Sequence, residues 1–216
     1  MKGDLGAAMA LRIGIVDTGV NPWHSHVRGA VDGCRIFVDA QGRIDEDDDF
    51  RDPIGHGTAV AGLVREAFPE AEIYAVRVFD ERDTTYPSLV ARGLLRAAAQ
   101  GCSHINLSLA VPAGAGTRLL QEACAAAIEA GCVLVAPLHP AWPDALPAAL
   151  PGVYAARADD TLGPGEVRRE GPRRLCAPDR PRELALAVPR SNLRGPSFAC
   201  TRVLLHLARE QLSGQG

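Results

Sequence analysis

Residues 12–19 read RIGIVDTG, and this stretch gives the clearest indication of the fold. Residues 12–16 are a short run of β-type residues, and Asp17, Thr18 and Gly19 form a turn signal directly after it. In sheets of parallel strands, functional residues gather where strands end and helices begin. Asp17 is therefore expected at the carboxyl end of a strand, where a functional carboxylate would lie.

The same kind of segment repeats along the chain. Apolar β-type runs cover residues 73–79, 104–109, 132–136 and 153–156. Helical patterns cover residues 57–66, 87–100 and 117–130, and the last two are followed by Gly101 and Gly131, as helices often are. Strands that alternate with helices predict βαβ units. We therefore expect an α/β fold in three layers, a mainly parallel β-sheet with helices on both faces.

Length and composition limit the possible classes of protein. The chain has 216 residues, of which 47% are hydrophobic, and a formal net charge of −3. This length suits one domain, expected over residues 12–212, with an N-terminal extension at residues 1–11 and a short tail at 213–216. The small net charge gives no general attraction to nucleic acid. No apolar run approaches the roughly 18 residues that cross a bilayer, so neither nucleic acid nor membrane is an expected partner.

The cysteines and the N-terminus indicate the compartment. The six cysteines show no CxxC spacing and lie in or near apolar segments, which is typical of buried, reduced thiols. Residues 1–11 contain Asp4 and no long apolar stretch, unlike a secretory signal. A cytoplasmic location is expected.

Three short motifs carry candidate chemistry. Asp17 ends IGIVDTG, His56 lies in GHGTAVAG at residues 55–62, and Ser197 lies in GPSFA at residues 195–199. Each motif alone is common, but together they supply an acid, a base and a nucleophile. A serine hydroxyl needs an imidazole to remove its proton, and the imidazole needs a carboxylate to orient it. A dinucleotide-binding function is excluded, because the turn after the first strand is not GxGxxG and the chain has no P-loop.

The three motifs, in the order Asp, His, Ser, resemble those of the subtilisin-like serine proteases. The segments INLSLA at 105–110, AGCVLVAP at 130–137 and LCAPD at 175–179 agree with later parts of that family. The resemblance implies a serine endopeptidase that acts on peptide or protein substrates. No cofactor is expected for this chain. In it Ser197 would be the nucleophile, His56 the base and then the acid, and Asp17 the group that orients His56. Ser108, Leu109 and Ala110 would contact the substrate backbone and line the first specificity pocket.

The sequence also departs from the family pattern. The family usually carries Gly-Asn after its fourth strand, with the asparagine amide stabilising the oxyanion, whereas residues 136–140 read APLHP. His139 is the residue here that can replace that donor. Pro196 precedes the nucleophile where the family usually has threonine, and Thr201 stands where the family usually has a proline. These departures leave open an alternative, a catalytically weakened subtilase fold that binds peptides or acts as a scaffold.

Two further expectations concern regulation and substrate. The short region before Asp17 has no room for a large pro-domain, which suggests a narrow-specificity processing protease acting on a dedicated precursor peptide or partner protein. Residues 39–52 form an acidic stretch just before His56 that would favour a basic substrate. Its residues 45–49 are a conceivable calcium site, but a solvated acidic loop is the simpler interpretation and no metal site is predicted.

Overall fold

A computed structural model describes residues 11–114, 116–183 and 192–214; most of the expected N-terminal extension therefore lies outside the described residues. Its centre is strand β1 (Arg12–Asp17), which pairs in parallel with β4 (Glu72–Arg77) on one side and β5 (His104–Leu107) on the other. Both neighbouring strands were expected from their apolar runs. Because β1 is central, the residue that ends it, Asp17, is held from both sides.

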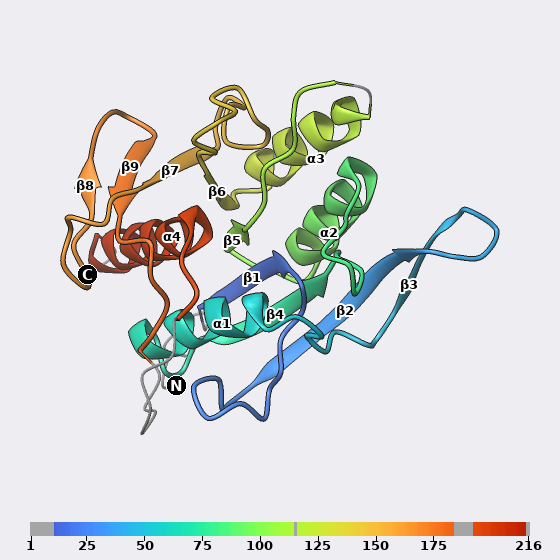
Figure 1. The fold of residues 1–216 in the computed structure, drawn as a ribbon, viewed down its shortest axis with the longest axis horizontal. Helices are drawn as coiled ribbons and strands as arrows, with labels where there is room; N and C mark the ends of the chain where they lie inside the picture. The colour runs from blue at the N-terminus through green and yellow to red at the C-terminus, as the bar shows by residue number, and fades with distance from the viewer. Residues whose placement is uncertain (1–10, 115, 184–191, 215–216) are drawn as a thin grey trace, which may run out of the picture.

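The remaining strands extend this sheet in both directions (Figure 1). The order is β3-β2-β4-β1-β5-β6-β7-β9-β8, and only the two edge strands, β3 and β8, run antiparallel to their neighbours. The strands not yet given are β2 (Val31–Val38), β3 (Ile44–Asp47), β6 (Val133–Pro137), β7 (Tyr154–Ala158), β8 (Arg168–Arg169) and β9 (Arg174–Ala177). The predicted α/β fold with a mainly parallel sheet is confirmed.

Helices cover both faces of the sheet, as predicted. Helices α2 (Pro87–Ala99) and α3 (Thr117–Glu129) pack on one face, in the same apolar cluster as Val16 of β1. Helices α1 (His56–Ala67) and α4 (Pro196–Ser213) pack on the other, with Ile13 and Ile15. The alternation along β1 follows from the two-residue period of a strand. The layers place the first residues of α1 and α4 on the same face of the sheet.

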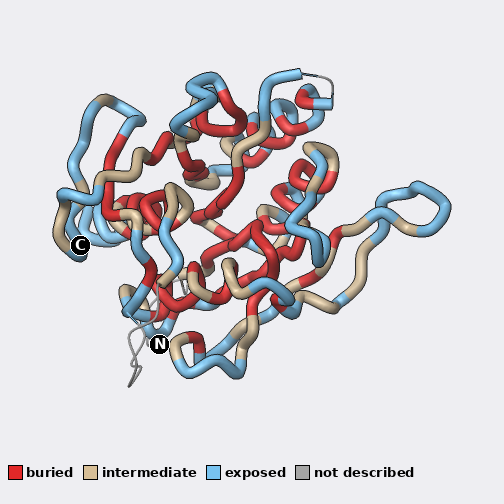
Figure 2. Tube along the Cα trace, viewed as in Figure 1, coloured by how far each residue is buried: buried red, intermediate tan, exposed pale blue. Residues whose placement is uncertain are grey.

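Burial agrees with this layered arrangement. The central strands and the inner helix faces are mostly buried, and most loops are exposed (Figure 2). The loop between β2 and β3 projects away from the body (Figure 1). Sequence patterns did not predict β2, β3, β8 or β9. These strands lie toward the sides of the sheet, and β2 alternates buried and partly exposed residues instead of forming one apolar run. None of the described helices is long and apolar enough to span a membrane.

One buried polar group lies at the amino end of a strand, away from the carboxyl ends where Asp17 lies. His104 begins β5 and is 2% exposed; its Nδ1 lies 3.0 Å from Ser103 Oγ, and its Nε2 has no partner among the described residues. Burial lowers the pKa of His104 from 6.5 to about 4, because a charged imidazole would lose its hydration without gaining a counter-charge.

We therefore predict that His104 makes the fold sensitive to acid. The unfolded chain binds a proton at this residue below pH 6.5 and the folded chain only near pH 4, so stability is lost as the pH falls through that window, by about 3 kcal/mol. Chemical denaturation between pH 7.5 and 4 measures this loss, and His104→Leu should remove it. His206→Gln, which changes a half-exposed histidine on α4, is the matched control. Its free energy of unfolding should depend on pH as that of the wild type does. Equal acid sensitivity of the wild type and His104→Leu would contradict the assignment.

Candidate active site

The three motif residues lie at the ends of elements that meet at one edge of the sheet. Asp17 is the last residue of β1, His56 is the first residue of α1, and Ser197 is the second residue of α4. Helix amino ends and the carboxyl ends of parallel strands both point to this edge. The structure therefore gathers residues that are 180 positions apart in the sequence.

Asp17 and His56 are in direct contact. The Nδ1 atom of His56 lies 2.8 Å from Oδ1 and 3.0 Å from Oδ2 of Asp17. The Asp17 side chain is 1% exposed and that of His56 is 27% exposed. Asp17 Oδ1 also accepts a hydrogen bond from the backbone N–H of Thr18, at 2.6 Å. Because an ionised carboxylate can only accept, the proton shared with His56 belongs on Nδ1, so Nε2 is the basic nitrogen when the imidazole is neutral.

The charge of Asp17 changes how readily His56 is protonated. It raises the pKa of His56 from 6.5 to about 9, burial opposes this shift, and the nearby charges of Asp52 and Asp83 add to it. A histidine held in this way is protonated at neutral pH and becomes a free base only in alkaline solution.

Ser197 lies beside this pair but is bonded elsewhere. Its hydroxyl donates to the backbone carbonyl of Ser108 at 3.4 Å, and no hydrogen bond joins it to His56 among the described residues. The His56 ring lies 5.3 Å from the ring of Phe198, the residue that follows Ser197. Catalytic hydrogen bonds are often long or misaligned before a substrate binds. The arrangement thus places the hydroxyl within the same small region as the imidazole without an assembled bond.

The donors available near Ser197 can be identified. Its backbone N–H is in the first turn of α4, where helices leave N–H groups free, and it has no acceptor among the described residues. His139 follows β6; its ring stacks on Trp142 at 4.1 Å and its Nδ1 lies 3.3 Å from the N–H of Ala141. If Nδ1 accepts that bond, a neutral His139 carries its proton on Nε2. The described contacts of His139 do not include Ser197, so its oxyanion role stays a prediction.

The three residues expected to contact substrate follow β5 directly. The sheet strand ends at Leu107, earlier than the apolar run suggested, and leaves Ser108, Leu109 and Ala110 outside it. Ser108 and Leu109 are buried and Ala110 is half-buried. Of the three, Ser108 reaches the site, through the bond from Ser197 to its carbonyl oxygen. Substrate binding by these residues also stays a prediction.

An ion pair that the sequence did not indicate fixes the loop before Ser197. Arg194 donates to both carboxylate oxygens of Asp179, at 3.1 Å each, and the N–H of Gly195 donates to the Asp179 carbonyl at 2.9 Å. A bidentate arginine–carboxylate pair restrains geometry as well as charge. In the sequence Asp179 stands out only as part of LCAPD. Its partner Arg194 lies 15 residues further along the chain, too far for a local sequence pattern to indicate the pair.

The acidic stretch before His56 is largely exposed, as expected, but part of it forms β3 and several of its carboxylates are paired. Asp47 pairs with Arg35, Asp49 with Arg51, and Glu46 with Arg96. These carboxylates are matched by arginines and do not converge on one point. This arrangement removes the main argument for a basic substrate at this loop and for calcium at residues 45–49.

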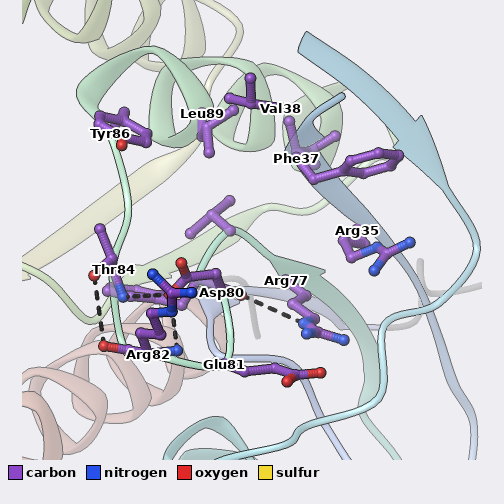
Figure 3. Close-up of a pocket in the computed structure, with 13 residues that line it drawn as sticks. Arg35, Phe37, Val38, Arg77, Asp80, Glu81, Arg82, Thr84, Tyr86 and Leu89 are labelled. Carbon is purple, nitrogen blue, oxygen red and sulfur yellow. Dashed lines mark hydrogen bonds between the residues drawn. The ribbon is translucent and has the colours of Figure 1, made fainter. Parts of the chain in front are cut away.

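A cavity of about 550 Å³ lies next to this region (Figure 3). Val38 and Leu89 line one side, and Arg35, Arg77 and Glu81 line the opposite side. Arg77 ends β4 and pairs in register with Asp17, so the cavity is one strand away from the candidate site. Its combination of apolar and charged walls suits an amphipathic group.

Cys200 lies three residues beyond Ser197 and is fully buried. Its thiol lies 3.2 Å from Asn106 Oδ1, and burial raises its pKa well above the ordinary value. A thiol kept protonated in this way is a poor nucleophile. Cys200 therefore packs beneath Ser197 and does not compete with it.

The fold is a mainly parallel α/β sheet with Asp17, His56 and Ser197 at one edge. A family model, the Subtilase family of peptidases S8, matches residues 9–137. The chain belongs to this family. The matched region includes Asp17 and His56 and ends before Ser197.

Individual relatives agree with the family. This chain is 35% identical to thermitase of Thermoactinomyces vulgaris over 143 aligned positions, which cover 62% of this chain and 48% of thermitase. The chain is 30% identical to subtilisin DY of Bacillus licheniformis over 135 positions, 58% of this chain and 46% of that protein. The chain thus spans about half the length of the curated relatives it matches.

Solved structures share the fold. A cold adapted subtilisin-like serine proteinase superposes with a TM-score of 0.73 at 23% identity, covering 94% of this chain and 75% of that one. A mutant of the protease domain of PatA superposes with a TM-score of 0.66 at 21% identity, covering 94% and 81%. At such identities the likeness concerns the fold.

Gly57 should be essential to the contact between Asp17 and His56. A Cβ at Gly57 would overlap the carbonyl oxygen of Gly19 and lie 3.1 Å from Asp17 Oδ1. We predict that Gly57→Ala pushes α1 away from β1 and destabilises the protein by about 2 kcal/mol, measured by chemical denaturation. Gly62→Ala is the control on the same helix, because its Cβ would meet only the side chain of His26, at 3.3 Å. If the two variants are equally stable, the close approach is not the constraint we describe.

Proposed function

We propose that this chain is a serine endopeptidase in which Asp17, His56 and Ser197 form the catalytic triad. The observation that carries the proposal is the contact of the buried Asp17 carboxylate with His56 Nδ1, at the same sheet edge as Ser197. A buried carboxylate bonded to an imidazole that begins a helix is the part of a triad least easily explained by packing alone. Membership of the subtilase family supports the same activity.

The proposed reaction uses these groups in turn. On substrate binding the Ser197 hydroxyl leaves the Ser108 carbonyl and gives its proton to His56 Nε2 while Oγ attacks the scissile carbonyl carbon. Asp17 stabilises the imidazolium that forms. The imidazolium then protonates the leaving amine, and water hydrolyses the acyl-enzyme by the reverse sequence. The Ser197 N–H, and His139 as a second donor, would stabilise the oxyanion.

For the substrate we propose a peptide or protein recognised over more than the scissile bond, as in a processing protease that acts on a precursor peptide. The cavity beside β4 supports this, since it offers a further binding position one strand away from Asp17. The six free cysteines, of which five are buried, support a reducing, cytoplasmic compartment. The proposal includes no cofactor.

The second candidate function is a peptide-binding protein with a weakened site. Two observations favour it: the Ser197 hydroxyl bonds to the Ser108 carbonyl instead of to His56, and the connection after β6 carries no asparagine. Such a protein would still bind peptides at the sheet edge. It would not activate Ser197.

A fluorophosphonate probe separates the two candidates, because it reacts with an activated serine. We predict labelling of the wild type at a single site, Ser197, located by intact mass and peptide mapping. Ser197→Ala should abolish the label and His56→Ala should slow it about a thousandfold or more. Cys200→Ala is the control for the neighbouring thiol and should label normally. Folded wild type without label would favour the binding protein.

The pH dependence of labelling follows from the raised pKa of His56. With a pKa of about 9, only about one His56 in a hundred is a free base at pH 7. The labelling rate should therefore rise between pH 7 and 10, with a midpoint near pH 9, measured as the second-order rate constant at each pH. A rate that is independent of pH over this range, or a midpoint at 6.5, would show that Asp17 does not hold His56 as described.

A further inference from the structure

Asp52 differs from the other acidic residues of the stretch before His56. It is 7% exposed and is the one buried carboxylate in residues 39–52, all of which are described. Among the described residues, no arginine pairs with it. Its two oxygens instead accept five hydrogen bonds from neutral donors. So many bonds on one buried carboxylate indicate a fixed structural position.

Four of these bonds hold the beginning of α1. Asp52 Oδ1 accepts from the N–H groups of Ile54 and Gly55, at 3.0 and 2.7 Å. Oδ2 accepts from the N–H and the hydroxyl of Thr58, at 2.8 and 2.6 Å. Gly55 precedes the helix and has no side chain to cap it. The carboxylate therefore caps α1 at the positive end of the helix dipole, directly beside His56.

The fifth bond reaches the end of β1. The Thr18 hydroxyl donates to Asp52 Oδ1 at 2.9 Å and accepts from the N–H of Gly57 at 3.0 Å. The same residue donates its backbone N–H to Asp17 Oδ1. Thr18 follows Asp17 in the chain and Gly57 follows His56, so the bond between Thr18 and Gly57 links the two catalytic candidates. Asp52 orients the Thr18 hydroxyl that makes this bond.

We propose that Asp52 is a positioning residue of the active site, which acts through Thr18 to hold His56 at hydrogen-bond distance from Asp17. The importance of Asp52 for catalysis rests on the proposed function, but the test of its positioning role does not require activity. Reacting groups must be held within a fraction of an ångström for efficient catalysis. Asp52 is 7% exposed, and its described side-chain hydrogen bonds go to neither Asp17 nor His56, so it acts through Thr18 and the beginning of α1.

Electrostatics give the inference a second line of support. Burial raises the pKa of Asp52, but the bonds from Thr58, Gly55 and Ile54 outweigh burial and keep the pKa below its usual range. Asp52 is therefore ionised at neutral pH. Its charge adds to that of Asp17 in raising the pKa of His56, and the exposed Asp83 adds a smaller contribution.

The alternative is that Asp52 only caps the helix. Titration of His56 by NMR distinguishes the two roles, because it reads the Asp17–His56 contact directly and needs no activity. The variants are Asp52→Asn, which removes the charge, and Thr18→Val, which removes the link to β1 but leaves the charge and the four capping bonds. Asp45→Asn is the matched control, since Asp45 is exposed on β3 and, within the described part of the chain, its carboxylate accepts only the N–H of Glu46.

We expect the pKa of His56 to fall in both Asp52→Asn and Thr18→Val, and to stay at its wild-type value in Asp45→Asn. Fluorophosphonate labelling of both variants, compared at the pH where His56 is neutral, should be about tenfold to a hundredfold slower than that of the wild type.

Two results would overturn the inference. In the first, the melting temperature falls but the His56 pKa is unchanged in both variants, as a mere helix cap requires. In the second, the pKa of His56 falls in Asp52→Asn but not in Thr18→Val, which would mean that Asp52 acts on His56 only through its charge and not through Thr18. If Asp52→Asn does not fold, Thr18→Val decides between positioning and capping. If the fluorophosphonate probe does not label the wild type, the proposed function is contradicted, but the NMR titration of His56 still tests the positioning role of Asp52.

Discussion

The contact between Asp17 and His56 is the interaction on which the rest of the site depends. A carboxylate that is 1% exposed has to be matched by a positive charge or by hydrogen bonds, and Asp17 has His56 and the N–H of Thr18. β1 lies between β4 and β5, so Asp17 cannot move to meet its partner. The start of α1 has to come to Asp17, which requires a residue without a side chain at Gly57.

The two helices of one face complete the arrangement. α1 and α4 share an apolar cluster with Ile13, Ile15 and the buried Phe198. Packing of these side chains brings the first turn of α4 to the first turn of α1, and so brings Ser197 near His56. Both helices are also restrained at their amino ends, α1 by Asp52 and the loop before α4 by the Asp179–Arg194 pair. The core thus sets the coarse geometry of the site, and buried or half-buried carboxylates refine it.

Sequence patterns predicted the central part of this structure but not its supports. β1, β4, β5, β6 and β7 appear as apolar runs because helices cover them. β2 was missed because polar residues interrupt its apolar ones, and β9 was missed because it has only 4 residues. The motif residues could be chosen by residue type and position at element ends. Asp52 could not be separated from its acidic neighbours by composition. Its position before the helix, with a threonine six residues later, is the one local signal of a cap.

The central claim is that this edge of the sheet hydrolyses peptide bonds with Asp17 orienting His56. The most direct measurement is the cleavage of a complex peptide mixture in water enriched in oxygen-18, with new carboxyl termini identified by mass spectrometry. The wild type should produce labelled termini that share a sequence preference, and Asp17→Asn should produce them about four orders of magnitude more slowly. Equal cleavage by the two proteins, or none by folded wild type, would contradict the account.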